Sequence, residues 1–207
     1  EVNGKKIFAA DEQIDINSDE LKISGKIVTV RRYLYIMLNK PSGVLSAAKD
    51  PDCPTVVDLL PPELSRRGLF PAGRLDKDTE GLLLLTNDGD LAHRILSPRH
   101  GVWKRYYAEH EGAAGPADVR AFEDGLVLAD GLHCLPANLT PLGPGRSVVE
   151  VQEGKYHQVR RMLASRGLPV TYLRREAEGK LTLGDLTLGQ TKELNIVEAE
   201  RLLLNIL

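Results

Sequence analysis

The most informative stretch of the sequence is Pro71-Ala-Gly-Arg-Leu-Asp-Lys-Asp-Thr-Glu-Gly-Leu-Leu-Leu-Leu-Thr-Asn-Asp-Gly89. It begins as a polar loop, densely charged between Arg74 and Asp78, and continues directly into an apolar run. A short apolar run bounded by turn residues is typical of a buried strand. The sequence therefore predicts a strand over 82–86 that pins the charged loop against the core, where the loop can hold a carboxylate at a cleft.

Two carboxylates stand out in this loop. Asp76 and Asp78 are two residues apart, so they share a face if the segment is extended. Such a pair could perform general acid–base catalysis or bind a hard cation, or it could bond to the backbone of its own turn. The residues alone leave all three interpretations open. Gly73 and Gly81 do not frame a Gly-Lys-Ser/Thr, so a phosphate-binding loop is not expected.

Outward from this stretch, short strands alternate with a few helices. Strands are expected over 33–38, 82–86, 102–108, 126–128, 132–139, 147–152 and 170–174, and helices over 89–96, 117–123, 157–166 and 196–206. Several strands are joined by turns too short to hold a crossover helix. The pattern predicts an α+β fold with a mixed, largely antiparallel sheet and flanking helices.

Residues 1–30 differ from the rest of the chain. They are polar and turn-rich, with strand-like fragments at 14–16 and 21–23. A segment this small cannot bury enough surface to be stable alone. We therefore expect it to belong to an accessory module, with a main domain over residues 31–207.

The composition excludes several classes of protein. Apolar residues make up 42% of the 207 residues and charged residues 27%, as in ordinary soluble domains. Two cysteines without a Cys-x-x-Cys exclude a disulfide scaffold and a multi-Cys zinc site, and favour a reducing compartment such as the cytoplasm. No apolar run approaches the roughly 18–20 residues of a membrane helix. The histidines are dispersed, and none pairs at the i, i+4 spacing expected of zinc ligands on a helix.

The charge is unevenly distributed. A net charge of −2 argues at first against a nucleic-acid partner, but two segments, 93–107 and 155–175, contain basic residues, aromatic residues and no acidic residue. Their basic residues are Arg94, Arg99, Lys104 and Arg105 in the first, and Lys155, Arg160, Arg161, Arg166, Arg174 and Arg175 in the second. Basic groups contact phosphates, and aromatic rings stack on unpaired bases. Solvated faces that pair with acidic segments elsewhere are the alternative.

Four segments, in order along the chain, resemble the motifs of RNA pseudouridine synthases. They are Gly73–Asp76 with Thr79–Gly89, Lys104–Tyr106, Glu153–Met162 and Leu181–Leu186. The resemblance spans roughly residues 32–194, and residues 156–159 look most like the branch that modifies small-subunit ribosomal RNA. Residues 2–5 and the fragments after them resemble the second half of an S4 RNA-binding domain, whose first helices would precede Glu1.

The resemblance implies that a uridine within RNA is isomerised without a metal or organic cofactor. Asp76 occupies the place of the catalytic aspartate, which attacks C1′ or removes the C2′ proton; both routes stay open. Tyr106 corresponds to the tyrosine that stacks on the uracil and assists proton loss at C5, with core packing as the alternative. Arg160 corresponds to a basic residue that pairs with Asp76, within about 6 Å.

Further positions follow from the same resemblance. Arg74 would help to fill the gap left by the extruded base, or would form an ion pair with Asp78 or Glu80. RNA contacts are also expected from Lys104, Arg105, Lys155, Tyr156, His157 and Arg161. Glu178 stands where the family usually has an aliphatic residue, and we expect it to lie away from the aligned catalytic positions.

The sequence thus predicts an enzyme, a cytoplasmic and monomeric pseudouridine synthase. Its partner would be ribosomal RNA or a ribosomal assembly intermediate, with small-subunit (16S) rRNA favoured and no membrane association. A large-subunit (23S) rRNA pseudouridine synthase is the first alternative. The others are a non-catalytic RNA-binding or ribosome-assembly protein on the same fold, and a metal-dependent hydrolase that uses Asp76 and Asp78.

Overall fold

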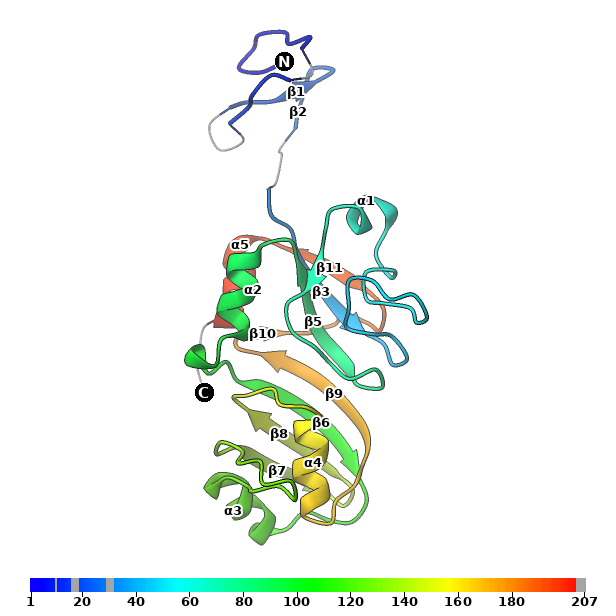
Figure 1. The fold of residues 1–207 in the computed structure, drawn as a ribbon, viewed down its shortest axis with the longest axis vertical. Coiled ribbons are helices and arrows are strands. Elements are labelled where there is room, and N and C mark those ends of the chain that lie inside the picture. The colour runs from blue at the N-terminus through cyan, green and yellow to red at the C-terminus, as the bar shows by residue number, and fades with distance from the viewer. Residues whose placement is uncertain (10, 16–18, 29–31, 204–207) are drawn as a thin grey trace.

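The computed structural model describes residues 1–9, 11–15, 19–28 and 32–203. Its main feature is one large sheet built from β3 (Tyr35–Lys40), β4 (Phe70–Pro71), β5 (Glu80–Thr86), β6 (Lys104–His110), β7 (Asn138–Gly143), β8 (Arg146–Val151), β9 (Val170–Glu178), β10 (Leu181–Thr182) and β11 (Thr191–Leu194). The strand order is β11-β3-β5-β9-β6-β8-β7, with β4 beside β5 and β10 beside β9 (Figure 1). Every pair is antiparallel except β5 and β9, which run parallel. The predicted α+β fold is therefore confirmed.

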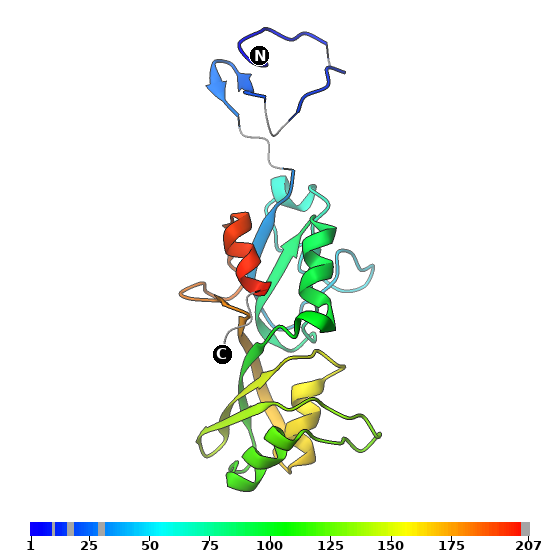
Figure 2. The same cartoon turned by 90° about the vertical axis from the view of Figure 1, so that its left-hand side faces the viewer.

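The helices lie beside the two halves of this sheet. They are α1 (Pro62–Ser65), α2 (Gly89–Leu96), α3 (Pro116–Asp124), α4 (Gln158–Ser165) and α5 (Ile196–Glu200), with 3-10 turns at Pro98–His100 and Arg201–Leu203. Helices α2 and α5 accompany β3 and β5, whereas α3 and α4 accompany β6 to β8 (Figures 1 and 2). The sheet thus joins two halves, and β9 runs between β5 of one half and β6 of the other.

The predicted strand of four leucines, β5, lies inside the sheet between β3 and β9. Leu82 to Leu85 are all 0% exposed, because β5 is covered on both faces. Leu83 and Leu85 belong to one core cluster, and Leu82 and Leu84 belong to a second cluster on the opposite face. The charged loop before β5 is therefore anchored by a strand that cannot shift without opening both cores.

Helix α2 begins where the Asn87-Asp88-Gly89 turn predicts. The Asp88 carboxylate accepts the backbone N–H of Leu91 at 3.0 Å, which caps the helix. The same carboxylate accepts the Tyr35 hydroxyl at 2.7 Å and so ties the cap to β3. The expected helix over 89–96 is confirmed.

Some elements differ from the prediction. The expected strand over 132–139 is reduced to a single bridge between Val127 and His133, and β7 begins only at Asn138. Strand β9 runs on to Glu178 because its pairing with β6 continues through an irregularity in the register. The closing helix is α-helical only over Ile196–Glu200, and residues 204–206 of the expected helix lie outside the described part. Strand β11 was not predicted, because residues 191–194 form a strand through their pairing with the distant β3.

The first residues form a small separate ladder. Strands β1 (Lys22–Ile23) and β2 (Lys26–Ile27) pair with each other, and Val2 bridges Lys5 and Leu21. The expected fragment at 14–16 is not a strand at Ile14 and Asp15, and residue 16 lies outside the described residues. The division between residues 30 and 31 stays a prediction. In the described ranges, no helix combines the length and apolarity needed to cross a membrane.

Candidate active site

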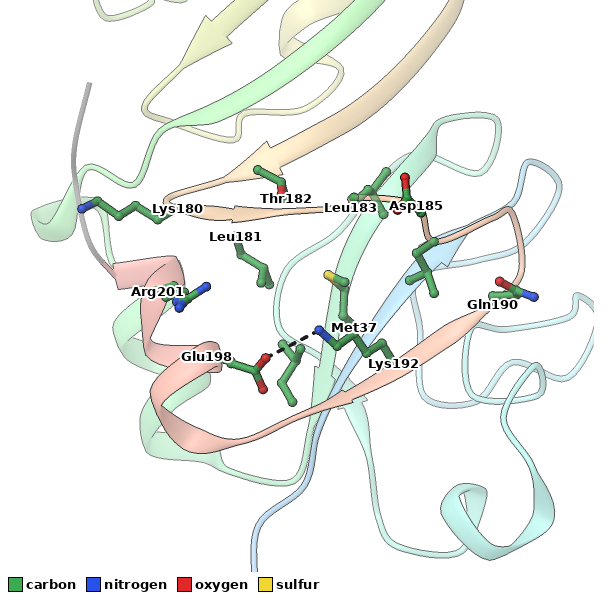
Figure 3. A pocket seen from close by; sticks show the side chains of 13 residues that line it. Met37, Lys180, Leu181, Thr182, Leu183, Asp185, Gln190, Lys192, Glu198 and Arg201 are labelled. Carbon is green, nitrogen blue, oxygen red and sulfur yellow. Dashed lines mark ion pairs between the residues drawn. The ribbon is translucent and has the colours of Figure 1, made fainter.

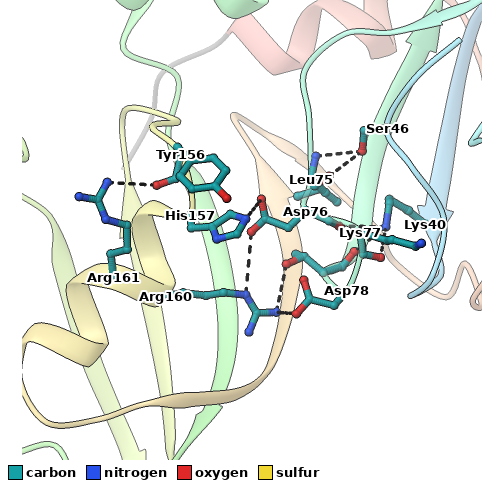
Figure 4. A network of polar contacts seen from close by, with 11 residues as sticks. Lys40, Ser46, Leu75, Asp76, Lys77, Asp78, Tyr156, His157, Arg160 and Arg161 are labelled. Atoms are coloured by element: carbon teal, nitrogen blue, oxygen red, sulfur yellow. Dashed lines mark hydrogen bonds and ion pairs between the residues drawn. The ribbon is translucent and has the colours of Figure 1, made fainter. Parts of the chain in front are cut away.

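A buried lysine holds the backbone of the loop that carries Asp76. Lys40, at the end of β3, is 0% exposed. Its Nζ donates to the carbonyl oxygens of Asp76 and Lys77 at 3.1 Å and of Thr79 at 2.9 Å (Figure 4). It also donates to the carbonyl oxygen of its neighbour Pro41 at 3.1 Å. Burial lowers the pKa of Lys40 to about 8, although the nearby carboxylates of Asp78, Asp76 and Glu80 act in the opposite direction. One ammonium group thus fixes the backbone at Asp76 and at the residues that follow it.

A serine holds the other edge of the loop. The Ser46 hydroxyl donates to the Leu75 carbonyl oxygen at 2.9 Å and accepts the Leu75 N–H at 3.0 Å. The Leu75 side chain is buried in the core, and the Thr79 N–H closes the turn onto the Asp76 carbonyl oxygen at 3.0 Å. Asp76 therefore projects from a rigid turn, with 28% of its side chain exposed.

The start of α4 faces the Asp76 carboxylate. His157 Nε2 lies 3.4 Å from Asp76 Oδ1, and Arg160 Nε lies 3.9 Å from Asp76 Oδ2 (Figure 4). The Asp76–Arg160 distance falls within the expected range. Arg160 makes a shorter ion pair with Asp78, at 2.9 Å from Nη2 to Oδ2. Asp78 therefore helps to place Arg160, which lies between the two carboxylates.

His157 is held in an unusual conformation. Its φ is 48°, in the left-handed region that few residues other than glycine adopt. The Tyr156 ring stacks on the imidazole with a centroid distance of 3.9 Å. From this position the imidazole reaches the Asp76 carboxylate. The sequence predicts only an RNA contact for His157, so the contact with Asp76 is an additional one.

Tyr106 lies in β6 on the cleft side of the sheet and is 8% exposed. It lines a small cavity of about 60 Å³ together with Asp76 and His157. The same ring also lines an adjoining cleft of about 700 Å³, within the size range of small-molecule binding sites. Burial raises the pKa of Tyr106, and the facing Arg175 guanidinium opposes that rise. Tyr106 is therefore a neutral phenol between the aspartate and the larger cleft.

The predicted RNA-binding residues are only partly gathered at this cleft. Arg74 is exposed at its edge and lines both cavities, as Lys155 does. The proposed partners of Arg74 are engaged elsewhere, since Asp78 pairs with Arg160 and Glu80 accepts the Tyr172 hydroxyl at 2.7 Å.

Three others have intramolecular partners. Lys155 Nζ lies 2.8 Å from Glu153, and Arg161 Nη2 lies 2.5 Å from Asp130. Arg105 follows the alternation of β6 to the face opposite Tyr106, where it pairs with Glu176 at 3.8 Å. The structure therefore does not bring Arg105 to the cleft.

The expectation for Glu178 was wrong. Its side chain is only 1% exposed, lines the large cleft with Tyr106, and lies 3.8 Å from the Lys104 ammonium. The reason is an irregularity in the pairing of β6 with β9, which the sequence pattern does not reveal. An acidic group thus lies in the floor of the cleft, next to a lysine predicted to contact RNA.

A second large cavity lies elsewhere on the molecule. It has a volume of about 420 Å³ and is lined mainly by β10, the segment after it, β11 and α5. Figure 3 shows Lys180, Lys192 and Arg201 around it, with Lys192 paired to Glu198 at 3.5 Å. None of the predicted site residues lines this cavity, so the cleft beside Asp76 is the candidate active site.

Sequence reasoning missed the supporting residues Lys40 and Ser46. The one signal for Lys40 was a lysine at the end of an apolar strand, directly before Pro41. Across residues 1–9, 11–15, 19–28 and 32–203, no group of three or more His, Cys, Asp or Glu side chains is placed to hold a metal ion.

Comparisons with known proteins point to one family. Residues 34–165 match the family model described as RNA pseudouridylate synthase. The chain is 43% identical over 209 residues to an uncharacterized RNA pseudouridine synthase of Bacillus subtilis, covering 99% of this chain and 87% of that protein. A crystal structure of a pseudouridylate synthase superposes with a TM-score of 0.78 at 34% identity, covering 98% of this chain and 87% of that one.

Two further relatives differ in the ribosomal subunit that their names give. Ribosomal small subunit pseudouridine synthase A of Escherichia coli is 41% identical over 162 residues, covering 77% of this chain and 70% of that protein. Ribosomal large subunit pseudouridine synthase B of Bacillus subtilis is 35% identical over 207 residues, covering 97% of this chain and 84% of that protein.

Proposed function

The chain belongs to the RNA pseudouridine synthase family, and from this membership we propose that it isomerises one specific uridine of ribosomal RNA to pseudouridine. The observation that carries the proposal is the placement of Asp76. Its carboxylate projects from a loop bound by Lys40 and faces His157 and Arg160 at 3.4 and 3.9 Å. A reacting carboxylate held this firmly loses little entropy when the substrate binds.

The proposed reaction begins with the target uridine turned out of the RNA into the cleft. The Asp76 carboxylate attacks C1′ or removes the C2′ proton, and the bond between N1 and C1′ breaks. The detached uracil turns, and a bond forms between C5 and C1′. In the first route the Asp76 oxygen leaves C1′ as this bond forms, and in the second route Asp76 returns its proton to C2′. The proton on C5 is then transferred to N1 with the help of a general base. The ring thereby keeps its atoms, and no oxidant or reductant is consumed.

Each surrounding residue has a part in this proposal. Arg160 and His157 orient the carboxylate from the start of α4. The neutral Tyr106 ring, buried between Asp76 and the large cleft, provides a flat surface for the uracil and a hydroxyl near C5. Arg74, exposed at the edge of the cleft, is placed to fill the space that the base leaves in the RNA.

We favour small-subunit ribosomal RNA as the substrate. Residues 156–159 resemble that branch, and in this chain they include the stacked Tyr156 and His157 beside Asp76. The similarity over nearly the whole chain to a protein named for the large subunit supports the second candidate. Pseudouridine mapping in both ribosomal RNAs of a deletion strain decides between them, and an unchanged small-subunit map would refute our choice.

The N-terminal residues complete the proposal. Residues 1–30 would act as part of an S4-like module that docks RNA, with the exposed Lys5 and Lys26 as phosphate contacts. Replacement of Lys5 and Lys26 by glutamate is expected to raise KM for ribosomal RNA and leave kcat nearly unchanged.

The direct test uses Asp76→Asn in the full chain. We expect no isomerisation of ribosomal RNA by this variant while it still binds the RNA, because the amide neither attacks C1′ nor accepts a proton. Asp90→Asn, an exposed carboxylate in α2, is the matched control and is expected to behave as wild type. Appreciable turnover by Asp76→Asn would refute the catalytic assignment. Activity that disappears with a chelator would support the hydrolase alternative.

A further inference from the structure

The floor of the large cleft contains three buried charged side chains. They are Lys104 of β6 and Arg175 and Glu178 of β9, with 13%, 2% and 1% of each side chain exposed. All three line the same cleft as Tyr106. Charged groups are rarely removed from water to this extent unless they compensate one another.

A β-bulge brings them together. Lys104 pairs with Glu178 and Tyr106 pairs with Arg175, and the register shifts between Arg105 and Tyr106, which leaves Glu176 as the additional residue on β9. In a regular strand Arg175 and Glu178 would point to opposite faces. Because of the bulge, both side chains are buried on the face of Tyr106, whereas the Glu176 side chain is 29% exposed.

The two cations are also fixed by the backbone. Lys104 Nζ donates to the Val102 carbonyl oxygen at 3.0 Å, and Arg175 Nε donates to the Leu82 carbonyl oxygen at 2.8 Å. Leu82 belongs to β5, the strand that follows the Asp76 loop. Arg175 therefore links the strand behind Asp76 to the strand that carries Tyr106.

Glu178 lies between these cations. Its Oε1 is 3.8 Å from Lys104 Nζ, and its Oε2 is 3.4 Å from Arg175 Nη2. Within the described part of the chain, neither carboxylate oxygen has a hydrogen-bond partner, so the carboxylate acts through its charge. Without it, an ammonium and a guanidinium would face each other in a buried site next to Tyr106, with only repulsion between them.

We propose that Glu178 is a positioning residue for the isomerisation: it holds Lys104 and Arg175 in the floor of the cleft and, through Arg175, holds Tyr106 in place beside Asp76. The inference rests on the proposed function, since it assigns Glu178 an effect on that reaction. Glu178 does not touch the reacting atoms, so its loss reduces the rate without removing the chemistry.

The test compares Glu178→Gln with Glu176→Gln in the full chain. Both changes remove one carboxylate from β9 and keep the size of the side chain, but Glu176 pairs with Arg174 and Arg105 on the other face of the sheet. With ribosomal RNA as substrate, we expect kcat of Glu178→Gln to fall about tenfold while KM stays within about twofold. Glu176→Gln is expected to match wild type in both constants.

A graded variant separates positioning from folding. Glu178→Asp keeps the charge but shortens the side chain by one methylene, so we expect a kcat about threefold below wild type. A wild-type kcat in Glu178→Gln, or a rise in KM with kcat unchanged, would overturn the proposal. If Glu178→Gln does not fold, Glu178→Asp decides: a folded Asp variant with a wild-type kcat overturns the proposal, and the threefold loss supports it.

Wild type and Asp76→Asn are measured in the same assay. If wild type forms no pseudouridine in ribosomal RNA, the proposed function is refuted and this inference with it. If wild type is active, Asp76→Asn is inactive and Glu178→Gln equals wild type, only the role of Glu178 is refuted.

Discussion

The ammonium of Lys40 donates a hydrogen bond to the carbonyl oxygen of Asp76 at 3.1 Å, although the two residues are 36 positions apart in the chain. Two more carbonyl oxygens of the same loop, those of Lys77 and Thr79, accept from the same nitrogen. The strand β3 thus controls the position of a loop that projects from the neighbouring strand β5.

Replacement of Lys40 by methionine is expected to lower both activity and stability. The side chains have similar length, but the carbonyl oxygens of the loop lose a charged donor and remain buried. We expect the free energy of unfolding to fall by about 3 kcal/mol and kcat to fall by more than about tenfold. Urea denaturation and turnover of ribosomal RNA provide the measurements. Lys49→Met, at an exposed position, is the control, and equal effects of the two changes would contradict the role of Lys40.

The pH dependence of activity and stability should also reveal the protonation of Lys40. Its pKa is about 8 in the folded chain, against an ordinary value of 10.5. The unfolded chain keeps this proton to higher pH, so the contribution of Lys40 to the free energy of unfolding increases from about pH 8 to 10.5. The neutral amine, however, has fewer N–H donors for the loop than the ammonium.

We therefore expect kcat to decline as the pH passes about 8, with no loss of stability from this group. Rate profiles and urea denaturation over the same pH range test this expectation. The decline should be absent from the residual activity of Lys40→Met, and a decline that persists there would assign it to another group.

The conformation of His157 predicts different effects for different replacements. Asparagine tolerates a positive φ, so His157→Asn should remain folded but lose the imidazole contact to Asp76, with a loss of about tenfold in kcat. Valine tolerates that φ poorly, so His157→Val should also lose about 1–2 kcal/mol of stability. Thermal denaturation and kcat separate the two effects, and equal stability of both variants would argue against the strained backbone.

Gly81 is required for the contact between β5 and β9. Its φ is 109°, and a Cβ at this position would overlap the backbone carbonyl of Arg175. Gly81→Ala is therefore expected to lower the free energy of unfolding by about 3 kcal/mol or more, or to prevent folding. Gly43, with a φ of 86° and open space around it, is the matched control, where alanine should cost only about 1 kcal/mol. Urea denaturation of both variants provides the comparison.

Elements that depend on interactions between near neighbours could be predicted from the sequence. The four leucines of β5, the Asp88 cap of α2 and the glycine after α3 are local signals, so the buried strand and these helices could be predicted correctly. The ordered motifs also indicated the family and the candidate residues Asp76, Tyr106 and Arg160. Such patterns need no knowledge of which distant segments meet, because hydrophobic periodicity and caps act over a few residues.

The residues around those candidates, in contrast, are set by contacts between segments that are distant in the chain. Lys40 reaches the Asp76 loop because β3 pairs with β5, and Glu178 reaches Lys104 because a bulge shifts the register of β9 against β6. A shift of one residue moves a strand side chain to the other face, so a local pattern cannot predict whether Glu178 or Glu176 is buried. Arg105 shows the same principle. Its basic neighbours suggest an RNA contact, but its position in β6 places its side chain on the face of the sheet away from the cleft.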